Sequence, residues 1–107
     1  MDIDYESSGI SIKLYYNFFK TPEIYLEHFS NESTKKKGQA RGVLRDIIVW
    51  LVHSKHIKTT DTFGLHAQSP DKKTQKGLES MYEKMGFKQI SNGNKPKYEQ
   101  SVGNYLK

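Results

Sequence analysis

Two short segments carry the residue types and the spacing that could bind a phosphorylated cofactor and move a proton. The first is a small-residue turn rich in lysine, Lys35-Lys36-Lys37-Gly38-Gln39-Ala40-Arg41. The second places Tyr82 four residues before Gly86, which an aromatic residue follows. Backbone N–H groups at the start of a helix bind phosphates. A phenol, which is neutral at pH 7, can act as a general acid.

The lysine-rich turn has the chemistry of a phosphate site. Gly38 would allow the backbone to approach a ligand closely, and Ala40 keeps that approach open one step into the helix. Lys35, Lys36, Lys37 and Arg41 add attraction for a polyanion. Taken alone, the segment is better explained as a solvated loop, because neither the Walker nor the Rossmann glycine spacing is present.

Together and in this order, the two segments resemble the core motifs of the GCN5-related N-acetyltransferases. The family's turn has the form Q/R-x-x-G-x-G/A, and Gly38 and Ala40 match its last two elements. Lys35 stands in place of the Gln or Arg and lacks a planar donor fork. The resemblance implies that acetyl-CoA binds along residues 35–41. Gln75 stands where many members have an asparagine that contacts the coenzyme.

The same resemblance implies a division of catalytic roles. Tyr82 would donate a proton to the leaving thiolate, and a carboxylate on the strand before the turn would take the proton of the attacking amine. Glu27 is the first candidate for that base, His28 the second and His66 the third. The alternatives stay open: a tyrosine that only packs against the sheet, and a glutamate that is merely exposed.

The elements that must position these residues follow from hydrophobic periodicity. Strands are expected over 10–19 and 24–29, joined as an antiparallel hairpin. Strict alternation would put Ile24, Leu26 and His28 on one face of the second strand. Tyr25, Glu27 and Phe29 would then lie on the other face.

The remaining pattern predicts a second, mixed part of the sheet. A helix that begins near residue 40 and fades over residues 54–58 carries apolar residues at three-and-four spacing, and Val49, Trp50 and Val52 widen its apolar face. That width predicts that the helix is covered on more than one side. A strand over 62–67, a helix over 74–85 ended by Gly86, a strand from 87 and a last strand over 98–105 complete an α/β fold.

The resemblance refines this fold class to a mostly antiparallel central sheet with a splayed strand pair and two main helices. Typical members carry one or two helices between their first two strands, and only residues 1–9 precede the first hairpin predicted here. The chain is similar in size and order to the minimal acetyltransferases that some phages use. Without those helices, the acceptor side should be open to a large substrate such as a protein, or completed by a homodimer.

Length and composition limit the number of domains and the kinds of site that the chain can contain. A length of 107 residues indicates a single domain, 1–107. The absence of cysteine excludes a disulfide scaffold and a cysteine nucleophile, and the four histidines show no metal-ligand pattern. There is no apolar run of membrane-spanning length, and the acidic N-terminus is unlike a signal peptide, so a cytoplasmic protein is expected.

Charge is distributed unevenly along the chain. Residues 1–34 hold two basic and six acidic residues, whereas residues 35–107 hold fifteen basic and six acidic ones. This asymmetry favours an anionic partner for the second part. Two alternatives to an active acetyltransferase therefore stay open: an inactive interaction module of the same fold, and a small basic protein that binds nucleic acid.

Overall fold

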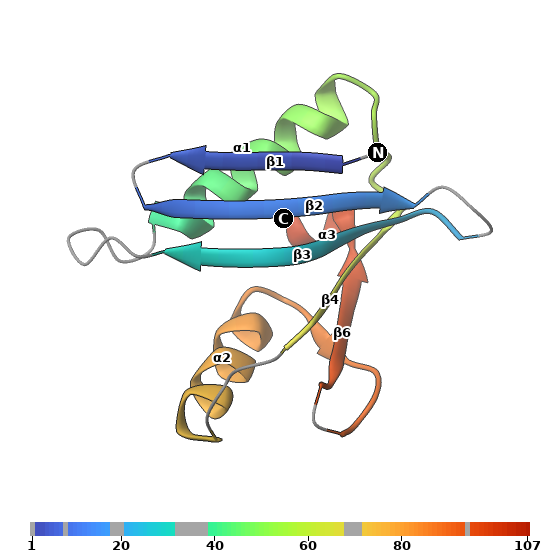
Figure 1. The fold of residues 1–107 in the computed structure, drawn as a ribbon. Coiled ribbons are helices and arrows are strands. Elements are labelled where there is room, and N and C mark those ends of the chain that lie inside the picture. Colours follow the sequence, from blue (N-terminus) through green and yellow to red (C-terminus); the bar gives the residue numbers. More distant parts are fainter. Residues whose placement is uncertain (1, 8, 18–20, 32–38, 68–71, 94) are drawn as a thin grey trace.

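The computed structural model describes residues 2–7, 9–17, 21–31, 39–67, 72–93 and 95–107, with the backbone alone at 31 and 72–74. Within these residues the chain forms one six-stranded sheet and three helices (Figure 1). The elements, in chain order, are β1 (Asp2–Ser7), β2 (Ile10–Asn17), β3 (Glu23–Asn31), α1 (Gln39–His53), β4 (Thr62–His66), α2 (Lys72–Lys84), β5 (Lys88–Gln89), β6 (Lys97–Ser101) and α3 (Val102–Tyr105).

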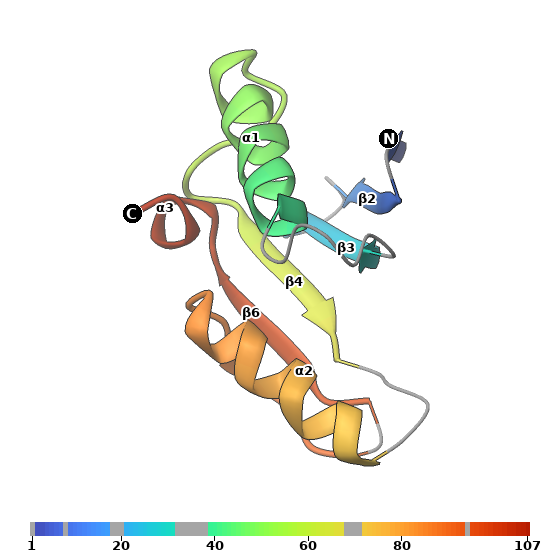
Figure 2. The same cartoon turned by 90° about the vertical axis from the view of Figure 1, so that its left-hand side faces the viewer.

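The strand order in the sheet is β1-β2-β3-β4-β6-β5. All neighbours are antiparallel except β3 and β4, which are parallel and are connected through α1. Both long helices lie on the same side of the sheet, which leaves its other face without a helical layer (Figure 2). The predicted α/β class, the mostly antiparallel sheet and the two main helices are confirmed.

Two elements differ from the prediction. Residues 2–7 form the edge strand β1, in which Ile3 and Tyr5 face the core side and alternate with exposed acids. The strand expected over 98–105 ends at Ser101 instead. The Ser101 side chain accepts a hydrogen bond from the Asn104 N–H and so caps the short helix α3. The serine cap begins a helical turn where a continuous strand was expected.

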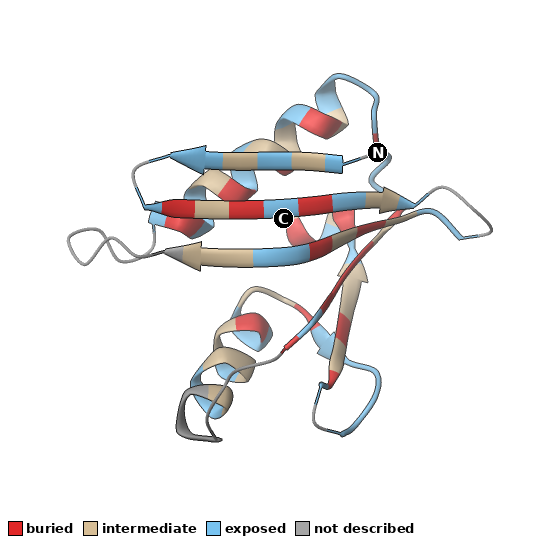
Figure 3. Ribbon diagram, viewed as in Figure 1, coloured by how far each residue is buried: buried red, intermediate tan, exposed pale blue. Residues whose placement is uncertain are grey.

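The core lies between the sheet and the helices. Buried residues of β2, β3, β4 and β6 face it. Along β2 they alternate with more exposed ones, whereas three successive residues of β4 are buried (Figure 3). One stripe of α1, formed by Ala40, Leu44, Ile48 and Leu51, covers the buried strand residues and is almost fully buried. The spacing of that stripe confirms the predicted amphipathic helix.

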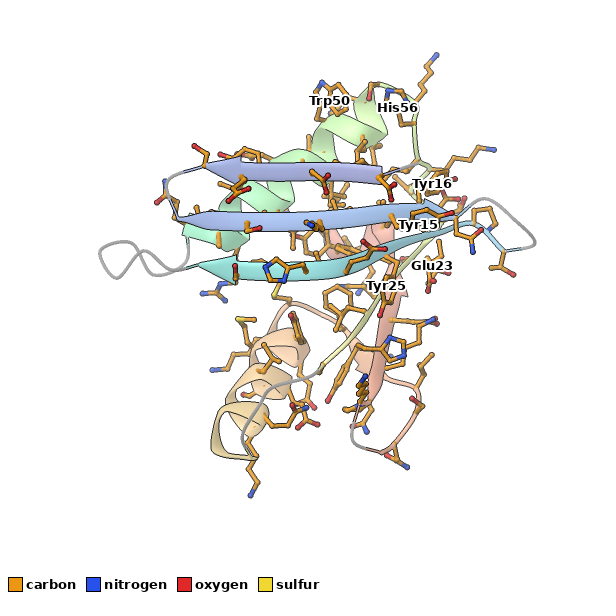
Figure 4. All side chains as sticks on the ribbon, in the orientation of Figure 1. Tyr15, Tyr16, Glu23, Tyr25, Trp50 and His56 are labelled. Carbon is orange, nitrogen blue, oxygen red and sulfur yellow. The ribbon has the colours of Figure 1, made fainter. Side chains whose placement is uncertain are left out.

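The prediction that α1 is covered on more than one side is wrong. Trp50 remains 60% exposed, and Val49 and Val52 are only partly buried. The sheet lies against one face of the helix, and the described residues place no second layer on the opposite face. The end of α1 that carries Trp50 extends past the edge strand β1 (Figures 1 and 4).

Candidate active site

The candidate site is built around the point where β3 and β4 separate. Their parallel pairing runs from Glu23–Thr62 to Leu26–Leu65 and stops there. Beyond that row β3 continues to Asn31 along β2, whereas β4 turns away beside β6 (Figure 1). This is the splayed strand pair that the resemblance predicted. The strand separation exposes main-chain groups of β3 that pair with no other described strand on that side.

A β-bulge lies at the separation point. Lys13 of β2 pairs with His28 and the next residue, Leu14, pairs with Leu26, so Glu27 is the extra residue of β3. A bulge of this kind bends the strand and redirects its side chains. Glu27 is exposed, one residue past the last β3–β4 pair.

The bulge corrects the predicted faces of β3. Strict alternation put His28 beside Leu26 and put Phe29 on the opposite face. In the structure Phe29 pairs with the buried Ile12 and packs against the core, while His28 pairs with the exposed Lys13 on the outer face. The extra residue shifts the alternation by one position. His28 is hydrogen bonded to Ser30 Oγ at 3.2 Å, farther along the strand than Glu27.

On the outer face of the sheet, near the Leu26–Leu65 pair, polar side chains from β3, β4 and β6 form a cluster. The Tyr25 hydroxyl is hydrogen bonded to His66 Nδ1 at 2.5 Å, and the two rings meet edge to face. Lys97 Nζ lies 3.1 Å from both Glu23 and Glu99. Tyr25 and Glu23 lie next to each other at this end of β3 (Figure 4).

Electrostatics in the cluster keep its members in defined protonation states. Partial burial, together with the nearby Glu23 and Glu27 carboxylates, raises the pKa of Tyr25, although Lys97 opposes this shift. Burial alone would lower the pKa of Lys97, but the ion pairs with Glu23 and Glu99 outweigh burial and raise it. At neutral pH, Tyr25 is therefore a neutral phenol and Lys97 a cation held between two carboxylates.

Tyr82 lies on the opposite, core side of the same row. Its side chain is 6% exposed and packs against Tyr98 at a ring distance of 6.5 Å. Tyr98 pairs with Leu65, whose β3 partner Leu26 is the last residue before the strands separate. Burial raises the pKa of Tyr82 to about 12. Among the described residues its hydroxyl makes no hydrogen bond, so the proton it carries has no competing acceptor.

The motif that ends α2 also positions Tyr82. The Phe87 N–H donates to the Tyr82 carbonyl and the Gly86 N–H to the Glu83 carbonyl, which is the Schellman pattern. Gly86 has φ +100°, as this cap requires. The Phe87 ring then lies edge to face with Tyr82 at 6.0 Å. The predicted role of Gly86 as the helix stop is confirmed, and the spacing from Tyr82 to Phe87 follows from the cap.

Replacing Gly86 by alanine should destabilise the fold and lower any activity that depends on Tyr82. The new Cβ would lie 2.6 Å from Gln100 Oε1, and the left-handed backbone costs about 1–2 kcal/mol for an L-residue. Gly93→Ala is the matched control, since its φ is +115° but nothing lies within 4 Å. Urea unfolding should show a larger loss of the free energy of unfolding for Gly86→Ala than for Gly93→Ala. Equal losses would mean that the contact with Gln100 contributes nothing.

Of the residues predicted to bind the coenzyme, those that the structure describes lie on two helices. Gln39, Ala40 and Arg41 form the first turn of α1, whose backbone N–H groups have no partner within the helix. Ala40 is buried, while Gln39 and Arg41 are exposed. Residues 35–38, which complete the predicted turn, lie outside the described residues. The coenzyme-binding role of this turn stays a prediction.

Gln75 lies on the first half of α2 and is partly buried. Its Nε2 donates to the Ala67 carbonyl at 2.9 Å, directly after β4. This hydrogen bond links α2 to the end of β4, the strand that separates from β3. Its role toward a coenzyme stays a prediction.

The sequence pattern pointed to Glu27, His66 and Tyr82 but not to Tyr25, which is hydrogen bonded to His66. Its position two residues before Glu27 on the same strand could have indicated that it lies near the candidate base. What the sequence did not show is that Tyr25 reaches across to His66, because the β3–β4 register is set by tertiary structure.

Among the described residues, no three histidine, aspartate or glutamate side chains gather to hold a metal ion. Of the described helices, none is long and apolar enough to cross a membrane.

Comparison with known proteins gives structural matches only. No family model matches the sequence, and no curated protein matches it significantly. A chain of the AtaT–AtaR complex with bound DNA superposes with a TM-score of 0.66 at 11% identity, over 90% of this chain and 61% of that one. The KacTA–DNA complex gives the same TM-score and identity over 97% and 67%.

A third match carries a ligand of interest. It is a tyrosine-to-phenylalanine mutant of the AtaT toxin, bound to the C-terminus of the antitoxin AtaR and to acetyl-CoA. Its TM-score is 0.64 at 12% identity, over 90% of this chain and 62% of that one. The chain thus spans about three fifths to two thirds of these proteins. The matches establish that it has the fold of the GCN5-related N-acetyltransferases, and they leave its phage-like size and order as a resemblance.

Proposed function

We propose that this chain is an N-acetyltransferase that moves an acetyl group from acetyl-CoA to an amine, on a protein acceptor. The observation that carries the proposal is the row Leu26–Leu65–Tyr98, where β3 and β4 separate. A buried, protonated tyrosine lies on one side of this row and a bulged glutamate on the other. Acetyl-CoA in a solved structure of the same fold supports the choice of coenzyme.

Two features of the described residues support coenzyme binding. The first turn of α1 offers N–H groups that have no partner within the helix, together with positive helix-dipole charge, to a pyrophosphate. Past Leu26, the main chain of β3 has polar groups that pair with no described strand on the β4 side, which suits an amide-containing arm. Acetyl-CoA, when bound, supplies the acetyl group as an activated thioester.

Each side chain then has one task. Glu27 accepts the proton of the acceptor ammonium, since only the neutral amine has a lone pair for attack. Main-chain N–H groups of β3 next to the bulge polarise the carbonyl that is attacked. Tyr82 donates its proton at Oη to the departing sulfur. His66, held by Tyr25, is the next candidate for the base, because it too lies one residue past the last β3–β4 pair.

The acceptor approaches from the outer face of the sheet. The described residues place no helix over that face, and Tyr15 is 40% exposed on it. An uncovered face of this kind suits an acceptor amine on a large molecule. Lysine side chains and the N-terminal amine of a protein are the acceptors we propose.

The test is the release of free coenzyme A thiol from acetyl-CoA in the presence of peptides that carry a lysine or a free N-terminus. The chain contains no cysteine, so a thiol-reactive dye reports coenzyme A alone. Glu27→Gln should lower kcat by about 10²-fold near neutral pH. The deficit should shrink as pH rises toward the pKa of the acceptor amine, because the amine then needs no base.

His28→Gln is the matched control, since it removes a titratable side chain from the adjacent position. It should leave kcat within about threefold of the parent, because the His28 side chain is hydrogen bonded to Ser30, farther along the strand than Glu27. A larger loss for His28→Gln or His66→Gln than for Glu27→Gln would reassign the base. Binding of acetyl-CoA without thiol release for any acceptor would favour the inactive interaction module.

A further inference from the structure

Helix α1 carries two apolar stripes, and the sheet covers only one. The buried stripe is Ala40, Leu44, Ile48 and Leu51. Beside it, Val43, Ile47 and Trp50 follow at spacings of four and three residues and form a second stripe. Val43 and Ile47 are partly buried, and Trp50 is 60% exposed. An exposed tryptophan at the end of an apolar stripe is typical of a protein interface.

A groove of about 370 Å³ runs between this second stripe and the edge strand β1. Ile3 and Tyr5 of β1 complete its apolar lining, and Asp4 and Asp46 also border it. Among the described strands, β1 has a neighbour only on its β2 side, so its other edge has unpaired main-chain groups. The Trp50 end of α1 projects past that edge (Figure 4). One more strand beside β1 would therefore lie under Val43, Ile47 and Trp50.

The opposite face of β1 is uniformly acidic. Asp2, Asp4 and Glu6 alternate with Ile3 and Tyr5, and the strand has no basic residue. Lys13 of β2 lies opposite Asp4, but the residues opposite Asp2 and Glu6 are the uncharged Tyr15 and Ser11. This acidic strand stands out in a chain with a net charge of +5.

We propose that the β1 edge binds a strand from a partner protein in which apolar and basic residues alternate. Main-chain hydrogen bonds to β1 would supply the pairing, and period-two side chains would supply the specificity. The partner's apolar side chains fill the groove under Val43, Ile47 and Trp50. Its lysine or arginine side chains lie on the other face, beside Asp2 and Glu6. The inference does not depend on the proposed acetyl transfer.

A second copy of this chain is a poorer occupant of the same edge. Antiparallel pairing of β1 with its own copy, with α1 on the same side in both copies, places the acids Asp2, Asp4 and Glu6 against one another. Like charges on opposite residues destabilise a strand pair. The charge pattern thus selects a basic strand and disfavours a homodimer through β1.

The test titrates the full chain with a synthetic peptide that alternates valine and lysine, followed by calorimetry and by the emission of Trp50. Trp50 is the chain's single tryptophan, so its emission reports the groove directly. Saturable binding, a blue shift of Trp50 emission and slower amide exchange along β1 are expected. A peptide with glutamate in place of lysine should not bind. A peptide with the same composition in apolar and basic blocks should bind at least tenfold more weakly.

Variants of the chain separate the groove from nonspecific attraction. Trp50→Ala should weaken binding of the Val-Lys peptide about tenfold or more. Ile90→Ala, which shortens a similarly exposed apolar side chain beyond β5, should leave the binding unchanged. The double variant Asp2→Lys with Glu6→Lys should bind the glutamate peptide more tightly than the lysine peptide. If the Val-Lys peptide fails to bind, or binds with no change at Trp50, the acids of β1 only protect an edge from aggregation and the proposal is wrong. Association of the chain alone through β1 would also overturn it.

Discussion

Replacing Tyr82 by phenylalanine should lower kcat for acetyl transfer by about 10²-fold or more while the protein remains fully folded. A positioned general acid contributes about 10²–10⁴-fold, and the substitution removes the proton that leaves with the thiol. The Tyr82 hydroxyl is buried and makes no hydrogen bond among the described residues. Its removal should therefore leave the free energy of unfolding unchanged or raise it by up to about 1 kcal/mol. Steady-state kinetics and urea unfolding measure the two effects separately.

Tyr98→Phe is the matched control for this substitution. Tyr98 lies in the same row, but its hydroxyl donates to Glu79 at 3.3 Å and is also bonded to Gln89 at 3.4 Å. Its loss should cost about 1 kcal/mol of stability and leave kcat within about threefold. A Tyr82→Phe enzyme with nearly normal kcat would show that the proton comes from another group.

The raised pKa of Tyr82 sets the expected pH dependence. Its pKa in the folded protein is about 12, above the value of 10 for an exposed tyrosine, because burial disfavours the phenolate. The associated stability is fully present below pH 10 and is lost as pH rises toward 12. Tyr82 therefore stays protonated throughout the pH range of an assay. A fall in kcat at pH 8–9 would have to come from a different group.

The parts of the fold that depend on local pattern could be predicted from the sequence. The stripe of α1 follows from three-and-four spacing, and the end of α2 follows from Gly86 and the capping geometry it permits. Tyr82 could also be singled out, because its place relative to Gly86 and Phe87 is fixed by a local motif. In each case the deciding interactions lie within a few residues of one another.

Features that depend on pairing between distant segments could not be predicted. The bulge at Glu27 arises from the register of β3 against β2, and it reversed the expected faces of His28 and Phe29. The bond between Tyr25 and His66 requires the parallel register of β3 and β4. The exposure of Trp50 was missed for the same reason, since periodicity reveals an apolar face and not what covers it.

Thermal unfolding of the whole chain with saturating acetyl-CoA shows whether the folded protein binds the coenzyme. It should be measured at about 0.5 M salt, where the Debye length is a few ångströms and nonspecific attraction is suppressed. At about 100 times its dissociation constant, a ligand of the folded state stabilises by about 2.7 kcal/mol. For a domain of this size the midpoint should rise by about 10 °C or more.

ATP at the same concentration is the control, because it carries polyphosphate charge without the pantetheine arm. A large shift of the unfolding midpoint is expected with acetyl-CoA and a much smaller one with ATP. Equal shifts would show attraction to phosphate alone and would favour the nucleic-acid-binding alternative. No shift at saturating acetyl-CoA would show that the proposed acetyl transfer is wrong, because the separation of β3 and β4 would then not hold the coenzyme.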